Sequence, residues 1–273
     1  MKVLLLLLFL VFMTTLPAED AEKSSVVLNA SLGVGVLSYE ERATITPVVS
    51  EWDSAEGVLS LDGVILYEDL QPYASFRYSS SAKNEEEWRE NGFLVQENDL
   101  EVTSSEIRAG VQFPFRKEKG FTITPRVGAL YSEDEYTRDN FFFLVQGATL
   151  FNVNQQVVET VRTAGPTAGV VVEVQISDSL RFELDAEIAW LGFAEAENDG
   201  FDVTIEANEG WEYAARLSLF KDLKREGTTL GVGLKVDRKE IDGAVISAPD
   251  STIEYPDNTL DRVSLEFVWS TTF

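Results

Sequence analysis

The sequence predicts an all-β fold, a transmembrane antiparallel up-and-down β-barrel of about ten strands. Three observations support this prediction. Apolar and polar residues alternate over about ten residues at a time, short and long connections alternate between these segments, and charged strand residues share one face. A strand that crosses a bilayer at a tilt needs about ten residues. A soluble β-sandwich would also alternate, but it has no reason to segregate its connections by length.

The clearest alternation is "LRFELDAEIAW", residues 180–190, in which every second residue is apolar and the residues between are charged or small. Residues 168–176 alternate in the same way, and only residues 177–179 separate the two segments, so they form a tight hairpin. The other predicted strands are 26–39, 56–67, 71–80, 107–115, 121–131, 211–219, 230–236 and 263–273.

The connections fall into two classes, which predict two different sides of a membrane. Short turns are expected near 67–71, 116–120, 177–179 and 221–227, and long acidic loops near 40–55, 81–103, 132–163, 192–210 and 238–259. In bacterial barrels the short turns are periplasmic and the long loops extracellular. Residues 141–161 leave two alternatives, a hairpin extending into a loop or two further strands of a twelve-stranded barrel. Their second half is poorly apolar, which favours ten strands.

The N-terminus, "MKVLLLLLFLVFMTTLPAED", predicts a secretory signal peptide over residues 1–18. A short periplasmic segment, 19–25, and the barrel domain, 26–273, follow it. An uncleaved membrane anchor is the alternative, but the apolar run is short for a spanning helix. The chain has no Cys, so a lipid-anchored Cys and disulfides are both excluded.

The charge balance is strongly acidic. With 22 Lys and Arg against 47 Asp and Glu, the formal net charge is −25, and the mean hydropathy is −0.06. Such a chain repels phosphate backbones, so nucleic acid is excluded as a partner. Almost all of the excess negative charge lies in the five long connections.

Strand charges are expected to face the lumen, because a charged side chain facing lipid costs about 2–4 kcal/mol near the midplane. Acids and bases are nearly balanced on this face, so we expect them to pair across a largely filled lumen. The predicted lumen charge network comprises Arg77, Arg108, Arg126, Glu173, Arg181, Glu183, Asp185, Glu187, Glu212, Arg216, Lys235 and Glu266, with Asp62, Asp237 and Arg262 on the same face.

Aromatic residues gather at both ends of the predicted strands, as expected for girdles at the two membrane interfaces. The girdle residues are Tyr78, Tyr131, Trp190, Trp211, Trp269 and Phe273. Tyr39 is expected with the girdle at the long-loop side and Phe220 with the girdle at the short-turn side.

The absence of His and of Cys limits the available chemistry. Neither a Ser-His or Asp-His mechanism nor a Cys nucleophile can be assembled. Acid–base work by the carboxylates Glu183, Asp185 and Glu187 is conceivable, but nearby Arg residues favour a structural ion network. We therefore expect a protein that is not an enzyme and that has no cofactor.

Residues 195–206, "EAENDGFDVTIE", partly match a calcium-loop pattern, with Glu195, Glu197, Asp199, Gly200 and Glu206 at positions 1, 3, 5, 6 and 12. A calcium or magnesium site at these carboxylates is therefore a hypothesis. The Glu at position 1 and the flanking strands favour the alternative, an acidic solvated loop.

The last strand resembles the C-terminal targeting signal of Gram-negative outer-membrane barrels, with Leu265, Phe267, Trp269 and Phe273 as the matching residues and Thr271 as a less usual occupant. This resemblance implies a location in the bacterial outer membrane and recognition by the barrel-assembly machinery.

The first strands resemble those of the MipA/OmpV-like barrels, on Gly33, Gly35, Tyr39, Pro47, Pro72 and Tyr78. Glu40-Glu41 departs from the Gly-Ser that usually follows the Tyr. This resemblance implies a non-enzymatic envelope scaffold that associates with peptidoglycan-remodelling proteins.

Two functions follow from these expectations. The first is a monomeric structural or interaction protein whose acidic loops meet the lipopolysaccharide layer. The second is a narrow, porin-like channel for small solutes, which its acidic mouth would make cation-preferring.

Overall fold

The computed structural model describes residues 25–43, 45, 47–67, 70–118, 120–145, 148–200, 202–223, 227–248 and 251–273. The predicted signal peptide, 1–18, and residues 19–24 lie outside the described residues. Within them no helix is long and apolar enough to cross a membrane.

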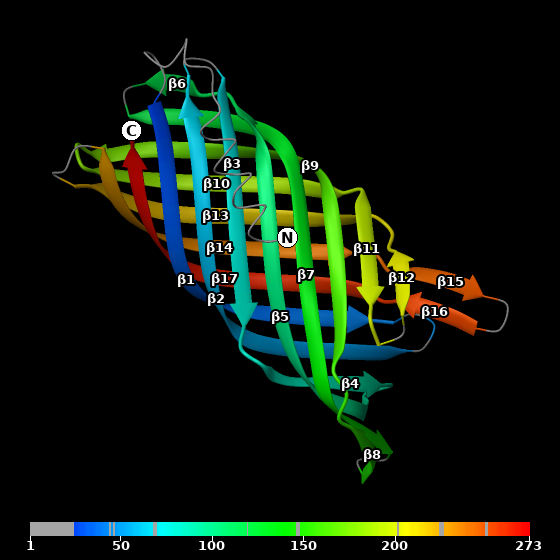
Figure 1. The fold of residues 1–273 in the computed structure, drawn as a ribbon. Helices are drawn as coiled ribbons and strands as arrows, with labels where there is room; N and C mark the ends of the chain where they lie inside the picture. Colours follow the sequence, from blue (N-terminus) through cyan, green and yellow to red (C-terminus); the bar gives the residue numbers. More distant parts are fainter. Residues whose placement is uncertain are drawn as a thin grey trace.

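Ten long strands follow one another around a barrel (Figure 1). They are β1 (Ser25–Arg42), β2 (Val48–Leu66), β3 (Gln71–Ser81), β5 (Phe93–Gln112), β7 (Phe121–Val145), β9 (Val157–Ser177), β10 (Leu180–Leu191), β13 (Gly210–Asp222), β14 (Thr228–Ile241) and β17 (Asp257–Thr272). The shorter strands are β4 (Asn84–Glu90), β6 (Phe115–Glu118), β8 (Ala148–Val153), β11 (Phe193–Asn198), β12 (Val203–Glu206), β15 (Ala244–Ala248) and β16 (Ser251–Tyr255).

Every pairing around the ring is antiparallel, and β1 closes it by pairing with both β2 and β17. The spatial order is β1-β2-β3-β5-β7-β9-β10-β13-β14-β17. The prediction of a ten-stranded barrel is therefore confirmed. Residues 141–161 form the end of β7, the hairpin strand β8 and the start of β9, so the twelve-stranded alternative is wrong.

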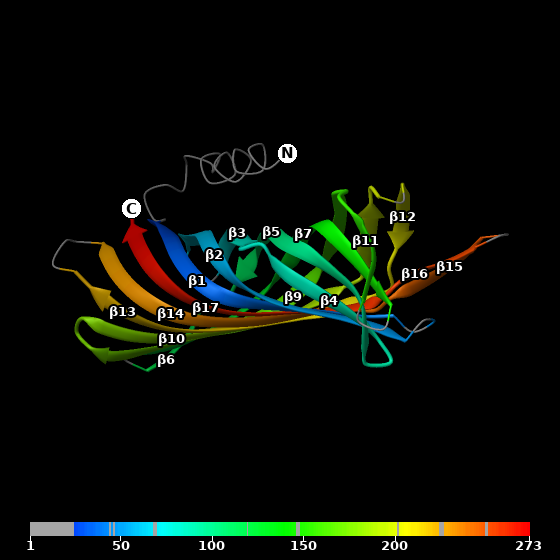
Figure 2. The same cartoon turned by 90° about the horizontal axis from the view of Figure 1, so that it is seen from below.

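The two ends of the barrel differ as the connections predicted. At one end, which we call the turn end, lie the short β2–β3, β9–β10 and β13–β14 connections, strand β6, and the two described chain ends. Figure 2 shows the C-terminus beside the start of β1 at this end, with β12, β15 and β16 at the other, which we call the outer end.

At the outer end, most of what the sequence predicted as loop is strand. β1 continues to Arg42, β5 begins at Phe93, and β7 runs on to Val145. The β4–β5 hairpin turns at Asn91 and Gly92, which both have positive φ as a two-residue type I′ turn requires. The expected loops at 81–103 and 132–163 are therefore mostly extensions of the wall, because paired strands satisfy backbone groups that a loop would leave to solvent.

Along the same strands, the face that carries the apolar side chains changes from the outside of the barrel to the inside. Near the turn end, apolar residues such as Leu32 and Phe267 are exposed on the outside, while Glu266 is buried inside. Towards the outer end of β5 the outward residues are acidic, such as Glu101, whereas the inward Leu100 is fully buried. The first region has the pattern of a membrane barrel, and the second, which we call the outer extension, has that of a water-exposed barrel with an apolar interior.

Two aromatic residues lie on the opposite face from the one predicted. Tyr39 points inward and is buried in the outer extension, because it lies three residues after the outward-facing Val36 and therefore on the opposite face of β1. Phe220 is also buried, and the guanidinium carbon of Arg181 lies 4.9 Å from its ring centroid. Both belong to the lumen and not to a girdle.

The last residue supports a prediction about assembly. Phe273 is 73% exposed, its N–H donates to the carbonyl of Val26 at 2.9 Å, and its carbonyl accepts from the N–H of Val26 at 3.2 Å. We expect deletion of Phe273 to reduce insertion in cells strongly, while the thermal stability of protein refolded in detergent changes little. Membrane fractionation and heat-modifiable gel mobility measure the two effects.

The matched control is Phe115→Ala, which removes an exposed aromatic ring at the turn end without touching the C-terminus. Equal insertion of the Phe273 deletion and of Phe115→Ala would contradict a targeting role for the last residue.

Candidate functional site

The lumen brings the predicted charge network together. The network residues form ion pairs inside the barrel, apart from Glu266, which accepts hydrogen bonds from Ser31 and Ser264. The ion-paired members are Arg77, Arg108, Arg126, Glu173, Arg181, Glu183, Asp185, Glu187, Glu212, Arg216 and Lys235, together with Asp62, Asp237 and Arg262.

Several pairs cross the lumen. Arg77 on β3 is bonded to Asp237 on β14, and three strands separate these two along the shorter way round the ring. Arg108 on β5 is bonded to Glu187 on β10 and to Glu212 on β13. Side chains from strands that do not pair can meet only through the interior, so these pairs are bridges across the lumen.

The widest bridge joins opposite walls. Asp134 on β7 lies 3.3 Å from the guanidinium of Arg262 on β17, and four strands separate them on either side. The same carboxylate accepts from the ammonium of Lys239 at 2.7 Å, and Ser132 accepts from that ammonium at 2.6 Å. All these side chains are almost completely buried, so the bridge closes the middle of the barrel.

A second set of pairs lines the wall nearer the turn end. Arg126 forms a bidentate pair with Asp185, with N–O distances of 2.7 and 3.0 Å, and its Nε lies 2.7 Å from Glu187. Arg181 pairs with Glu173 at 2.5 Å. Bidentate guanidinium–carboxylate pairs fix geometry as well as charge, so the pair with Asp185 fixes the position of the Arg126 guanidinium on this wall.

Beyond the bridges, the lumen of the outer extension is filled by apolar side chains, which we call the outer plug. Each of them is at most 3% exposed, and they come from strands all around the barrel. The outer plug comprises Leu37, Tyr39, Trp52, Leu100, Val102, Leu130, Tyr136, Val161, Leu191, Ile241, Tyr255 and Leu260.

One cation lies at the edge of the outer plug among three carboxylates. Arg138 is 2.8 Å from Glu86, 3.0 Å from Glu41 and 3.9 Å from Glu159. The rings of Tyr39, Trp88 and Tyr136 surround it, with centroids 5.6 to 5.9 Å from its guanidinium carbon. We call these four charged residues the Arg138 cluster. Because Arg138 is the one basic residue among three buried acids, the cluster has excess negative charge unless a proton is held.

The two carboxyl groups that accept hydrogen bonds from Arg138, those of Glu41 and Glu86, have pKa values shifted in opposite directions. Burial raises the pKa of Glu41 to about 7, although Arg138 opposes this rise and Tyr39 donates to Glu41 at 2.5 Å. Burial acts on Glu86 as well, but Arg138 and hydrogen bonds from Ser50 and Asn98 hold its pKa below the ordinary value. Of these two carboxyl groups, Glu41 is therefore the one that binds a proton more readily.

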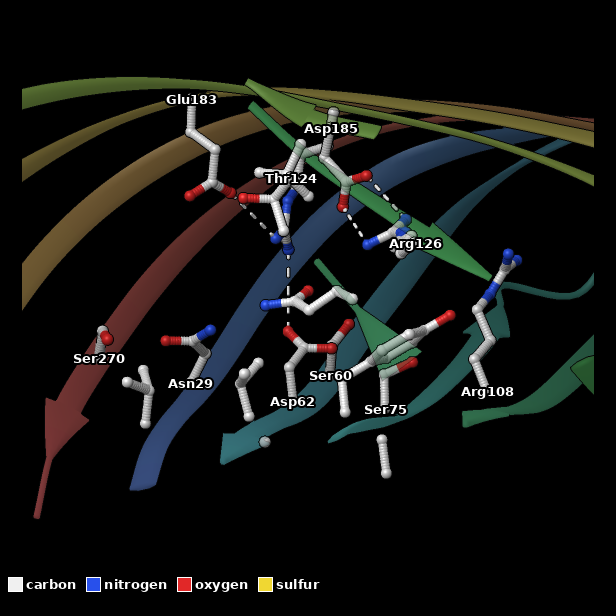
Figure 3. Close-up of a pocket in the computed structure, with 18 of the residues that line it drawn as sticks. Asn29, Ser60, Asp62, Ser75, Arg108, Thr124, Arg126, Glu183, Asp185 and Ser270 are labelled. Atoms are coloured by element: carbon white, nitrogen blue, oxygen red, sulfur yellow. Dashed lines mark hydrogen bonds and ion pairs between the residues drawn. The ribbon is translucent and has the colours of Figure 1, made fainter. Parts of the chain in front are cut away.

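On the turn-end side of the bridges, the lumen contains a cavity of about 650 Å³. It reaches from Arg77 and Arg108 to residues at the strand ends such as Gln71 and Ser270. In Figure 3, dashed lines join Asp62 and Glu183 to one guanidinium between them, that of Arg216, and Asp185 faces Arg126. The expectation of a largely filled lumen therefore describes the outer half of the barrel, and the turn-end half is open.

A close approach of backbone and side chain shapes the wall of the cavity. A Cβ atom at Gly128 would lie 2.6 Å from the Tyr73 hydroxyl oxygen, so only glycine leaves room for the tyrosine there. The Tyr73 ring in turn lies against Arg126, with 5.6 Å between the ring centroid and the guanidinium carbon.

The structure does not bring the described carboxylates of the calcium hypothesis for residues 195–206 together at metal-ligand spacing, and the hypothesis stays a prediction. Glu195 and Glu206 are paired neighbours on β11 and β12, and Arg162 neutralises Glu195 and Glu197 at 3.2 and 3.0 Å. Asp199 accepts from the Val158 N–H. Among the described residues, the one carboxylate group with metal-ligand spacing is Glu85, Glu87 and Glu97, where Glu87 is bonded to Arg89.

The other predicted residues lie on the outer face of the barrel. Trp190, Trp211, Trp269 and Phe273 are exposed there, and Tyr78 and Tyr131 are partly exposed on the same face. Leu265, Phe267 and Trp269 of the proposed assembly signal form an exposed stripe along β17, and the exposed Phe273 follows the end of that strand.

Several lumen residues were missed from the sequence, namely Glu41, Glu56, Glu86, Glu106, Asp134, Arg138, Glu159 and Lys239. Most were assigned to loops because both faces of the outer extension carry polar residues, which hides the alternation. They can be identified by counting every second residue from a known inward-facing position, because alternate residues of a strand lie on the same face. Counting in twos from Leu130 along β7 leads to Asp134 and Arg138 on the inner face.

No family model matches the sequence, and no curated protein matches it. Among solved structures, the outer membrane protease OmpT from Escherichia coli is similar, with a TM-score of 0.67, 10% identity, and coverage of 91% of this chain and 97% of that chain. The chain has the fold of an outer-membrane β-barrel.

Two other barrels match with lower TM-scores. The translocator domain of the autotransporter NalP from Neisseria meningitidis gives 0.39, with 13% identity and coverage of 90% and 88%. A FadL homologue from Pseudomonas aeruginosa gives 0.33, with 9% identity and coverage of 92% and 90%. Identities this low show the fold alone, and the resemblance to MipA/OmpV-like barrels stays a prediction.

Proposed function

We propose that the chain is a non-enzymatic protein of the bacterial outer membrane, monomeric, and closed to solute flow by its own side chains. The observation that carries this proposal is the bridge between Asp134 on β7 and Arg262 on β17, reinforced by Arg77 with Asp237 and closed above by the outer plug. We infer that a lumen spanned from wall to opposite wall and then packed with apolar groups, as in the described part of the chain, blocks a continuous aqueous path.

The chemistry of the lumen supports the same proposal. The chain has no His and no Cys, so the nucleophilic mechanisms that need them are excluded. The carboxylates that acid–base catalysis would need are paired with guanidinium groups, as Glu187 is with Arg108 and Arg126. The fold that this chain shares with OmpT does not by itself imply a protease mechanism, because unrelated functions occur on one fold.

We propose that the protein has a structural role in the envelope or mediates interactions there. With the turn end in the periplasm, the outer extension stands above the membrane and presents outward acids such as Glu101 and Glu133. We propose that this surface meets lipopolysaccharide phosphates through divalent cations, because both partners are anionic. Peptidoglycan-remodelling proteins are the proposed partners at the turn end.

A narrow cation-preferring channel is the second candidate, and the cavity of about 650 Å³ favours it. Planar-bilayer recording of the refolded protein separates the two functions. We expect no stable conductance steps, because the bridges and the outer plug lie in series with the cavity. Insertion is verified by heat-modifiable gel mobility of the same sample, and stable, ohmic, cation-selective steps would establish the channel instead.

A further inference from the structure

The cavity contains charged side chains that have no closely bonded partner within the barrel. Six basic and six acidic side chains line it, so its lining is neutral overall. Most of these groups are bonded to one another, as Arg126 is to Asp185 and Arg181 is to Glu173. The exceptions decide what the cavity can bind.

Arg216 on β13 is the first exception. Its guanidinium lies 3.8 Å from Asp62 and 3.6 Å from Glu183, which is beyond the 2.7–3.2 Å of a direct hydrogen bond. Its buried Nε has no partner among the described residues. Arg216 therefore neutralises charge, while its terminal N–H groups make no direct hydrogen bond to either acid and can donate to a ligand.

Lys235 on β14 is the second exception. It is the cross-strand neighbour of Arg216, and its nearest acid is Asp237 at 3.6 Å. Like charges opposite each other on adjacent strands repel, so an anionic group between these two bases would be stabilising. Asp62 and Glu183, whose ion pairs with Arg216 are equally loose, offer acceptors to a cationic group on the facing sides of the same cavity.

We infer that this cavity is a binding pocket for a small zwitterion, a molecule with a carboxylate and an ammonium group, of the size of an amino acid or a short peptide. The carboxylate lies against Arg216 and Lys235, and the ammonium lies against Asp62 or Glu183. Neutral donors and acceptors on Asn29 and Ser60 complete the lining. The volume of about 650 Å³ lies within the range of small-molecule sites, roughly 300–1,000 Å³.

The ligand enters at the turn end, because the bridges of Arg77 and Arg108 form the far wall of the cavity. The side of the membrane from which it enters rests on the proposed function, but the binding itself does not. A free single-charge ion would fit less well, since it could satisfy only one of the two pairs of groups.

Calorimetric titration of the refolded protein with L-alanyl-L-alanine tests the pocket. We expect saturable binding of the dipeptide, and binding weaker by about tenfold or more for N-acetyl-L-alanine and for L-alaninamide, which each lack one charge. No saturable heat with the dipeptide, or equal binding of all three compounds, would overturn the inference.

Arg216→Gln should weaken dipeptide binding by about tenfold or more. Lys221→Gln, which removes a positive charge from an exposed position on the same strand, should not weaken it. Heat-modifiable mobility verifies that each variant is folded. Unchanged binding by a folded Arg216→Gln protein would place the ligand elsewhere.

A second measurement keeps the wild-type charges. Because the chain has no Cys, Ser75→Cys introduces a single thiol into the cavity wall. We expect L-alanyl-L-alanine to slow its reaction with a methanethiosulfonate reagent, and an unchanged rate would count against the pocket. In intact cells, labelling by an impermeant reagent from outside would contradict the closed lumen while leaving the pocket standing.

Discussion

Replacing Arg138 by Met should destabilise the barrel by about 3–5 kcal/mol, the usual cost of leaving buried charges without their partner. Glu41 and Glu86 are at most 2% exposed, and both accept directly from this guanidinium. Met keeps an unbranched side chain but lacks the guanidinium, so the loss reports on the charge together with the contacts of the guanidinium with the surrounding rings. Urea unfolding in detergent, followed by tryptophan fluorescence, measures the free energy of unfolding.

The matched control is Arg42→Met. Arg42 pairs with Glu40, but its side chain is 64% exposed, so its removal should change stability by at most about 1 kcal/mol. Adding Glu86→Gln to Arg138→Met removes one unpaired charge and should recover part of the loss. If Arg138→Met were as stable as Arg42→Met, the Arg138 cluster would not hold the outer extension together.

The stability of the wild-type protein should fall by up to about 3 kcal/mol as pH rises from 4.5 to above 7, relative to Glu41→Gln. Burial raises the pKa of Glu41 from 4.5 to about 7, so the folded protein holds a proton in this interval that the unfolded chain has released. Stability is therefore greatest at the acidic end and declines until the folded carboxyl has ionised.

The measurement is the midpoint temperature of the heat-modifiable transition at several pH values, for the wild type and for Glu41→Gln. Subtracting the two curves removes the contributions of other carboxylates, including Glu86, whose lowered pKa acts in the opposite sense. Parallel curves for the two proteins would show that Glu41 is already ionised near pH 4.5 in the folded state.

Much of this architecture follows from the alternation in the sequence. Strand number, the short turns, and the face of residues such as Glu266 and Phe267 all follow from a period of two, because consecutive residues on a strand must point to opposite sides. The charged lumen follows from the cost of facing lipid with Arg or Glu. The strands of the outer extension were not predicted because their apolar residues point inward. The membrane strands were identified by apolar residues that point outward.

Which side chains pair across the lumen could be known only from the closed barrel. Nothing in the sequence relates Asp134 to Arg262 or Arg138 to Glu41, residues that lie about a hundred positions apart or more. Which side chains meet depends on the order of strands in the ring, their stagger and the diameter that results, and these are properties of closure. The same geometry decides that Arg216 and Lys235 are left without close partners beside an open cavity. Local alternation determines the face on which each side chain lies, and only ring closure determines what it meets there.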